Sequence, residues 1–115
     1  MKSRFFPILA ALALPAAAGA DEVSFKTVSP IFKAKCTACH GLIPQGKLKL
    51  NSLKNVLKGG QNGKAVIPGD ADGSLMVKQF FLPLEAKTHM PPMGAKQLTA
   101  AEIATIKAWI DAGAK

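Results

Sequence analysis

Apolar and polar residues recur at helical spacing through most of the chain, most clearly towards its C-terminal end. There the segment Thr99-Ala100-Ala101-Glu102 has the pattern of a capping box, and Leu98 can pack on Ile103 as the matching hydrophobic staple. Gly113 stands where a C-terminal cap belongs. We therefore expect a helix between Thr99 and Gly113 that packs on the first helix through one apolar stripe. This stripe consists of Ile103, Ile106, Trp109 and Ile110.

A helix is also predicted immediately before the two cysteines. Ser29 can cap it, and Pro30 can occupy its first position, where a missing N–H group costs no hydrogen bond. Ile31 and Phe32 fall on one face of this helix. The helix is expected to run toward Cys36.

Two short helices are predicted between the cysteines and the C-terminal helix. Residues 51–52 offer a capping side chain for the first, and the pair Gly59-Gly60 ends it. Turn residues at 68–73 separate it from the second, which Ser74 caps. The apolar residues of the second helix are Leu75, Met76, Val77, Phe80 and Phe81. No alternating segment is long enough to predict a sheet, so the expected fold class is all-α.

The beginning of the chain has the pattern of an export signal. Lys2 and Arg4 form a positively charged start, an apolar run follows, and Ala18-Gly19-Ala20 offers small residues for cleavage. The apolar run is shorter than the ~18–20 residues that span a bilayer, which disfavours the alternative of an uncleaved anchor. We expect residues 1–20 to be cleaved on export to the periplasm. Residues 21–115 then form one domain without stable membrane insertion.

Five consecutive residues, Cys36-Thr37-Ala38-Cys39-His40, indicate the chemistry of this domain. Two cysteines three apart on a helical turn have both sulfurs on the same side, and the adjacent histidine supplies an imidazole there. C-x-x-C-H is the attachment signature of a c-type haem, in which the thiols add to two vinyl groups and the histidine binds iron. We therefore expect one haem c, attached covalently through Cys36 and Cys39, with His40 as an axial ligand. The C-terminal apolar stripe would also touch the edge of this macrocycle.

Two other kinds of site are compatible with the cysteine pair alone. A disulfide or a thioredoxin-like redox pair is one, but the redox pair normally stands in a βαβ unit. A structural zinc site is the other, and it normally has four cysteine or histidine ligands. The whole supply of such ligands in the chain is Cys36, Cys39, His40 and His89. The helical pattern and this short supply favour haem.

A second axial ligand has to come from a segment that can cross the open face of the haem. Residues 82–98 suit this role, because they connect two predicted helices and are stiffened by three prolines. The candidates in this segment are His89, Met90 and Met93, and an open site is the alternative to all three. On the proximal side, the second nitrogen of His40 is expected to donate to a backbone carbonyl, with the region of Pro44 as the candidate.

A series of short motifs follows one another along the chain in a specific order. The motifs are Ser29-Pro30-Ile31-Phe32, CTACHG at 36–41, Leu48-Lys49-Leu50, Gly59-Gly60, Ile67-Pro68-Gly69, SLMVK at 74–78, Met90-Pro91-Pro92, Leu98-Thr99 and KAWIDAGA at 107–114. Each motif is a weak signal alone, but their order over nearly the whole of residues 21–115 resembles that of planctomycete-type cytochrome c domains.

The resemblance implies both a fold and a ligand set. The implied fold is a small class I cytochrome c-like helical domain wrapped around one covalently attached haem. The family has a methionine on the far side of the iron, and its pattern matches Met90, directly before Pro91-Pro92. The expected metal ligands are therefore His40 and Met90.

The domain is strongly basic. Two of the 15 Lys and Arg residues lie in the predicted signal, which leaves 13 against 7 acidic residues and a net charge of +6. Nucleic acid is one possible partner for a basic domain, but predicted export and an aromatic content of 6% argue against it. Redox proteins with an acidic docking surface fit better. The proposed docking residues are Lys33, Lys35, Lys47 and Lys49, and plain solubility is the alternative role for them.

These features together predict a periplasmic one-electron shuttle with His/Met axial ligation, not an enzyme. The alternative is a haem sensor or a peroxidase-like enzyme with a labile sixth position. A distal pair of histidine and arginine would be typical of a peroxidase, but Arg4 is the only arginine and lies in the predicted signal.

Overall fold

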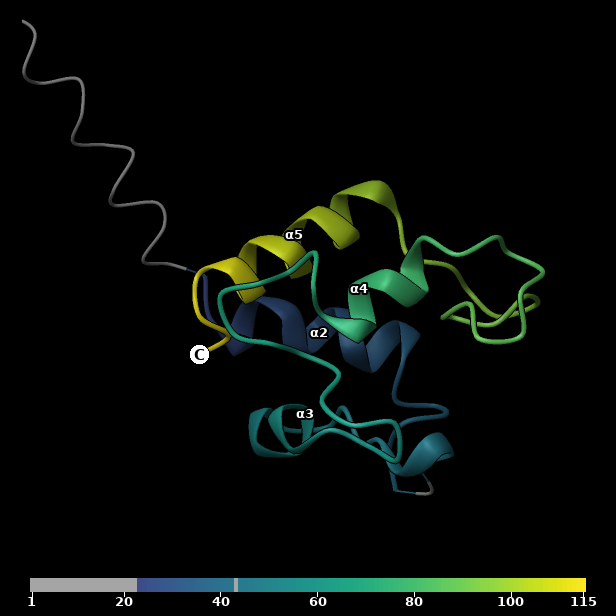
Figure 1. Ribbon diagram of the computed structural model, residues 1–115, viewed down its shortest axis with the longest axis horizontal. Helices are drawn as coiled ribbons and strands as arrows, with labels where there is room; N and C mark the ends of the chain where they lie inside the picture. The colour runs from purple at the N-terminus through teal and green to yellow at the C-terminus, as the bar shows by residue number, and fades with distance from the viewer. Residues whose placement is uncertain (1–22, 43) are drawn as a thin grey trace, which may run out of the picture.

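Helices and the loops that join them make up the described part of the chain, residues 23–42 and 44–115, in the computed structural model (Figure 1). In chain order the helices are α2 (Phe25–Lys35), the 3-10 turn η2 (Gln45–Lys47), α3 (Leu53–Lys58), α4 (Leu75–Phe80) and α5 (Ala100–Asp111). No strand is found among these residues, so the predicted all-α fold is confirmed. The predicted signal, residues 1–20, lies outside the described residues. None of the described helices is both long and apolar enough to cross a membrane.

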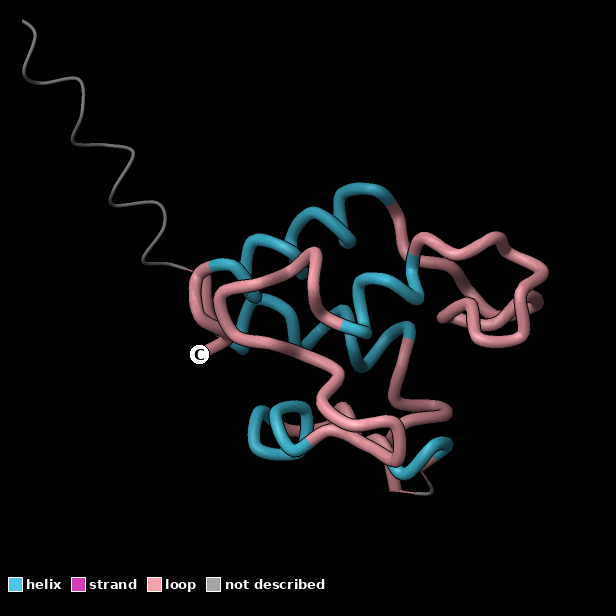
Figure 2. Tube along the Cα trace, viewed as in Figure 1, coloured by secondary structure: helices cyan, strands magenta, loops and turns pink. Residues whose placement is uncertain are grey.

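The two longest helices, α2 and α5, pack on each other through three aromatic rings. The ring centroids of Phe25, Phe32 and Trp109 lie 6.0–6.1 Å apart in all three pairs, within the roughly 4.5–7 Å of favourable aromatic pairs. Phe25 at the start of α2 is beside Trp109 near the end of α5, so the helices run antiparallel (Figure 2). The backbone N–H of Phe25 also donates to the carbonyl oxygen of Lys115 at 2.7 Å, which fastens the two ends together.

Helix α2 begins five residues earlier than predicted. Its N-cap is Ser24, and Pro30 lies inside the helix, whereas the sequence predicted Ser29 as the cap. An interior proline removes one helical hydrogen bond, but starting at Phe25 buries Val28 fully and brings the Phe25 ring onto the aromatic cluster. Burial of these apolar side chains outweighs the local preference of proline for the first turn.

The predicted C-terminal helix is confirmed as α5. The Thr99 hydroxyl accepts from the N–H of Glu102 at 3.1 Å, and the Glu102 carboxylate accepts from the N–H of Thr99 at 2.8 Å, which completes the capping box. Gly113 follows the C-cap with a φ of +113°, as expected for a C-terminal cap. Of the predicted stripe, Ile106, Trp109 and Ile110 are fully buried and Ile103 is partly buried.

The two short helices are also found where they were predicted. Ser52 caps α3 by accepting from the N–H of Asn55 at 3.2 Å. Ser74 is the N-cap of α4, but its hydroxyl accepts from the N–H of Ile67 and donates to the carbonyl of Asp70, so it fastens the preceding turn. Phe81 was predicted among the apolar residues of this helix. It lies beyond the last turn and is 63% exposed.

Gly59, at the end of α3, is the position where glycine is most strongly required. Its φ of +84° and ψ of −168° are accessible almost only to glycine, and a Cβ atom there would collide with the carbonyl oxygen of Gly63. The turn 59–63 therefore brings two backbone segments closer than any side chain allows.

Replacing Gly59 should destabilise the protein through both strain and collision. Gly59→Ala is expected to lower the free energy of unfolding, measured with urea, by about 1–3 kcal/mol. Gly69→Ala is the matched control, because Gly69 has a φ of +87° but nothing lies within 4 Å of the added Cβ. An equal loss in both variants would show that the close approach to Gly63 contributes nothing.

Candidate functional site

A cavity of about 360 Å³ opens between the cysteine segment, α4 and the loop before α5. Its volume falls within the roughly 300–1,000 Å³ of small-molecule and cofactor sites. Most of the lining is apolar side chains and glycine backbone, and segments far apart in the sequence contribute to it. The lining includes Cys36, Cys39, His40, Leu48, Leu50, Gly60, Ala65, Leu75, Met76, Phe80, Met90, Pro91 and Pro92.

The C-x-x-C-H segment forms a turn directly after α2. Cys36 is the C-cap of that helix, and its carbonyl oxygen accepts from the N–H groups of Cys39 at 3.2 Å and His40 at 2.9 Å. This turn brings both thiols and the imidazole to the lining of one cavity, as the spacing predicted. Cys39 is exposed and Cys36 is half-buried, so the thiol side of the cavity reaches the molecular surface.

His40 is oriented by a backbone carbonyl. Its Nδ1 lies 3.1 Å from the carbonyl oxygen of Leu48. Because a carbonyl only accepts, this hydrogen bond requires the proton on Nδ1 and leaves Nε2 as the nitrogen with a free lone pair. A backbone carbonyl was predicted as the partner, but the expected location near Pro44 is wrong. After η2 the chain returns to the motif, where the N–H of Leu50 donates to the carbonyl oxygen of His40 at 2.7 Å, and this return brings Leu48 within reach of the imidazole.

The three candidates for the second ligand occupy different environments. Met90 lines the cavity. Met93 is 64% exposed and is not part of the lining. His89 is buried, also outside the lining, with Nδ1 2.9 Å from the carbonyl oxygen of Leu82 and Nε2 2.9 Å from Oε1 of Gln97. Of the three, only Met90 is placed to reach a group in the cavity.

The environment of Cys36 is unlike that of a catalytic thiol. Burial, and to a smaller extent the nearby charge of Glu102, raise the pKa of the Cys36 thiol to about 11. Thiol oxidoreductases need the opposite, a lowered pKa that supplies thiolate at neutral pH. In addition, no group of three or more His, Cys, Asp or Glu side chains comes together in residues 23–42 and 44–115, and a structural zinc site would need such a group.

A model of the family described as Planctomycete cytochrome C matches residues 36–94. This match covers half of the chain and includes the C-x-x-C-H segment, α3, α4 and Met90. The chain belongs to this family. No curated protein and no solved structure matches it.

The residues of the cavity fit the haem of a cytochrome c. The two thiols and the imidazole lie on one continuous turn at its lining, the imidazole Nε2 is left free by the contact to Leu48, and most of the remaining lining is apolar. No residue of α5 lines the cavity. The expectation that the C-terminal stripe also touches the macrocycle edge therefore finds no support, and the stripe belongs to the α2–α5 core.

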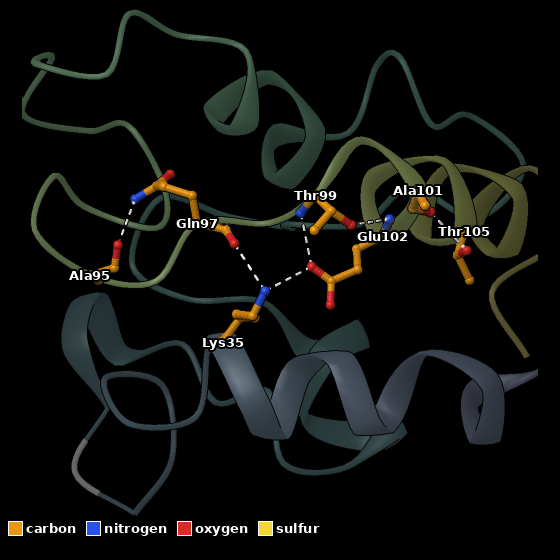
Figure 3. A network of polar contacts seen from close by, with 7 residues as sticks. All are labelled: Lys35, Ala95, Gln97, Thr99, Ala101, Glu102 and Thr105. Atoms are coloured by element: carbon orange, nitrogen blue, oxygen red, sulfur yellow. Dashed lines mark hydrogen bonds and ion pairs between the residues drawn. The ribbon is translucent and has the colours of Figure 1, made fainter.

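Lys35, the last residue of α2, is held inside the protein. Its Nζ donates to the carbonyl oxygen of Gln97 at 2.9 Å and to the Glu102 carboxylate at 2.8 Å, and its side chain is only 15% exposed (Figure 3). The proposed docking role of Lys35 is therefore wrong, whereas Lys33 and Lys47 are exposed. The Lys35–Glu102 pair joins residues far apart in the sequence, and the His40–Leu48 contact spans an irregular loop. No local sequence spacing therefore predicts either contact.

The Lys35–Glu102 pair predicts a specific pH dependence of stability. The hydrogen bond from Lys35, and next the one from the Thr99 N–H, lower the pKa of Glu102 from its ordinary value of 4.5. A carboxyl whose pKa is lowered by folding stabilises the protein above its unfolded pKa and loses this contribution as the pH falls through the folded value. Glu102→Gln should therefore destabilise the protein at pH 7, and the difference from wild type should shrink below pH 4.5.

Urea unfolding of both proteins, from pH 7 down to the acid limit at which they still fold, measures this difference. Glu85→Gln, at an exposed position, controls for the loss of one carboxylate. A difference that stays constant across the whole range would contradict the assigned role of Glu102.

Proposed function

We propose that this chain is a periplasmic electron carrier with one haem c attached through Cys36 and Cys39 and ligated by His40 and Met90. Residues 1–20 act as the cleaved export signal and residues 21–115 form the carrier domain. The observation that supports the proposal most directly is the cavity itself, whose lining contains both cysteines, His40 and Met90 but neither Met93 nor His89.

The haem, when bound, supplies a one-electron Fe(III)/Fe(II) couple. The hydrogen bond from Nδ1 of His40 to the carbonyl oxygen of Leu48 holds the imidazole in one orientation and leaves the lone pair of Nε2 free for a metal. Met90 offers a soft thioether sulfur, and a His/Met pair gives a higher reduction potential than two histidines. His40 and Met90 would hold the iron through the same two side chains in both oxidation states. Exposed Cys39 marks the surface through which electrons would pass.

The same lining disfavours the alternative of a peroxidase-like enzyme or sensor. His40 is the only histidine among the cavity-lining residues, and the only lysine there, Lys35, is bound to Gln97 and Glu102. The described residues thus place no free acid–base side chain next to Met90 that could move protons to a bound peroxide.

The visible absorption spectrum of the purified protein, oxidised and reduced, tests the ligand set. We expect a low-spin spectrum of covalent haem with a sulfur-to-iron band in the oxidised form, and no carbon monoxide binding to the reduced wild type. Met90→Ala should abolish the sulfur band, lower the reduction potential and open the iron to carbon monoxide, because the strong sixth ligand is lost.

Met93→Ala is the matched control, and it should leave all three properties unchanged because Met93 lies outside the cavity. The reverse pattern would make Met93 the ligand. Carbon monoxide binding to the reduced wild-type protein would instead favour the sensor or peroxidase-like alternative. If the protein carries no haem after expression with a cytochrome c maturation system, the proposal is wrong.

Charge along the chain supports an acidic redox partner. Residues 23–69 contain eight lysines and no acidic residue, whereas residues 70–115 contain five lysines and five acidic residues. The excess positive charge therefore belongs to α2, the cysteine segment and the region around α3 (Figure 1). Exposed Lys33 and Lys47, with the half-exposed Lys49, are the proposed docking residues.

Electron transfer to or from a small acidic copper protein should slow as ionic strength rises, because salt screens the attraction between the partners. The double variant Lys33→Glu/Lys47→Glu should slow the second-order rate at low salt by about tenfold or more. Lys78→Glu/Lys115→Glu changes the net charge equally but lies in the charge-balanced half, so it should slow the rate much less. Equal effects of the two variants would exclude a localised docking surface.

A further inference from the structure

The loop between α4 and α5 has no regular secondary structure, yet it has to present Met90 to the cavity. Local turns are its main backbone hydrogen bonds, and the N–H of Met90 itself donates to the carbonyl of Gln79 at 3.2 Å. Pro91 and Pro92, which follow Met90, have no N–H to donate. Backbone hydrogen bonds alone therefore constrain this part of the loop weakly.

One side chain, that of Gln97, supplies the missing connections. Its Nε2 lies 3.0 Å from the carbonyl oxygens of Pro91 and Pro92 and 3.2 Å from that of Ala95, and its two N–H groups are shared among these three acceptors. Three carbonyls around Nε2 fix the orientation of the amide, so that Oε1 faces Nε2 of His89 at 2.9 Å. Gln97 thus binds the chain on both sides of Met90.

The backbone of Gln97 is tied in turn to the cysteine side of the cavity. Nζ of Lys35 donates to the Gln97 carbonyl and to Glu102, and the residue after Lys35 is Cys36 (Figure 3). The partly buried ammonium group of Lys35, at the end of α2, therefore contacts both Gln97 at the end of the loop and Glu102 in the first turn of α5. Through it, the two segments that carry the proposed iron ligands have a fixed relative position.

We propose that Gln97 is a positioning residue for the Met90 ligand. Its side-chain amide holds the loop in the one arrangement that presents the Met90 sulfur to the cavity, and Lys35 anchors Gln97 to the segment that carries Cys36. This proposal rests on the proposed His40/Met90 ligation. Gln97 acts on the iron through Met90 and does not itself line the cavity.

The expected consequence of losing these bonds is easier displacement of Met90 by an added ligand. An added ligand binds only the fraction of molecules in which Met90 has left, so its apparent affinity follows the population of the open loop. Two or three lost hydrogen bonds correspond to a population change of about tenfold or more.

Imidazole titration of the oxidised holoprotein measures this population. Gln97→Ala removes all four contacts of the amide, and Gln97→Glu keeps the oxygen that faces His89 but turns the donor group into a second acceptor facing three carbonyls. Both variants should lower the apparent dissociation constant of imidazole about tenfold or more and weaken the sulfur-to-iron band. Lys35→Met, which leaves the amide intact, should act in the same direction to a smaller extent.

Two controls separate positioning from a general loss of stability. Ile110→Val weakens the α2–α5 core away from the loop, so it should lower the thermal midpoint and leave imidazole affinity unchanged. Lys96→Gln, exposed and adjacent to Gln97, should change neither quantity.

Wild-type imidazole affinity in the two Gln97 variants, with an unchanged sulfur-to-iron band, would overturn the positioning role while leaving the ligand set intact. The same holds if Ile110→Val raises the affinity as much as Gln97→Ala does. If wild type shows no sulfur band and already binds imidazole freely, the proposed ligation fails and this inference fails with it. If neither Gln97 variant binds haem, the imidazole affinity and the sulfur-to-iron band of Lys35→Met test the proposal instead, and wild-type values of both would overturn it.

Discussion

The antiparallel packing of α2 on α5 is the constraint on which the rest of the structure depends. At one end Phe25, Phe32 and Trp109 form an aromatic cluster, and at the other the Lys35–Glu102 pair joins the last residue of α2 to the first turn of α5. Each charge also lies at the helix end whose dipole it complements. The helix pair therefore fixes where the cysteine segment starts and where the loop that carries Met90 ends.

Placement of the binding residues follows from this frame. The cysteine turn extends from the end of α2, and the Met90 loop arrives at the start of α5, so the packing of these two helices brings both segments to the same cavity. The core of the helix pair is filled by protein side chains such as Trp109 and Ile106, and the cavity lies beside that core. Leu50, Ala65, Met76 and Phe80 belong to the hydrophobic core and also line the cavity, whereas no residue of α5 lines it, so α5 stabilises the cavity from outside its lining.

Polar contacts in the loop replace the regularity that a helix would provide. Pro91 and Pro92 have no N–H group to donate. The Gln97 amide donates to their carbonyl oxygens, and its own oxygen faces the buried His89. His89 is thereby a structural partner of the loop, although its residue type made it a candidate ligand. A residue's capacity to bind iron is decided by where its lone pair points, and both nitrogens of His89 face oxygen atoms.

Local chemistry in the sequence was sufficient for the two short helices, the C-terminal helix with its cap at Thr99 and the C-x-x-C-H turn, because each depends on residues a few positions apart. The choice of Met90 over its neighbours came from the resemblance to the family and stays a prediction. Local chemistry was insufficient for the true start of α2, the partner of His40 and the role of Lys35. Each of these depends on groups brought together by the packing of distant segments: burial of Phe25 against Trp109, the return of the chain at Leu48, and the meeting of α2 with α5. The free energy of these contacts is realised only in the folded chain, so the tertiary structure alone decides them.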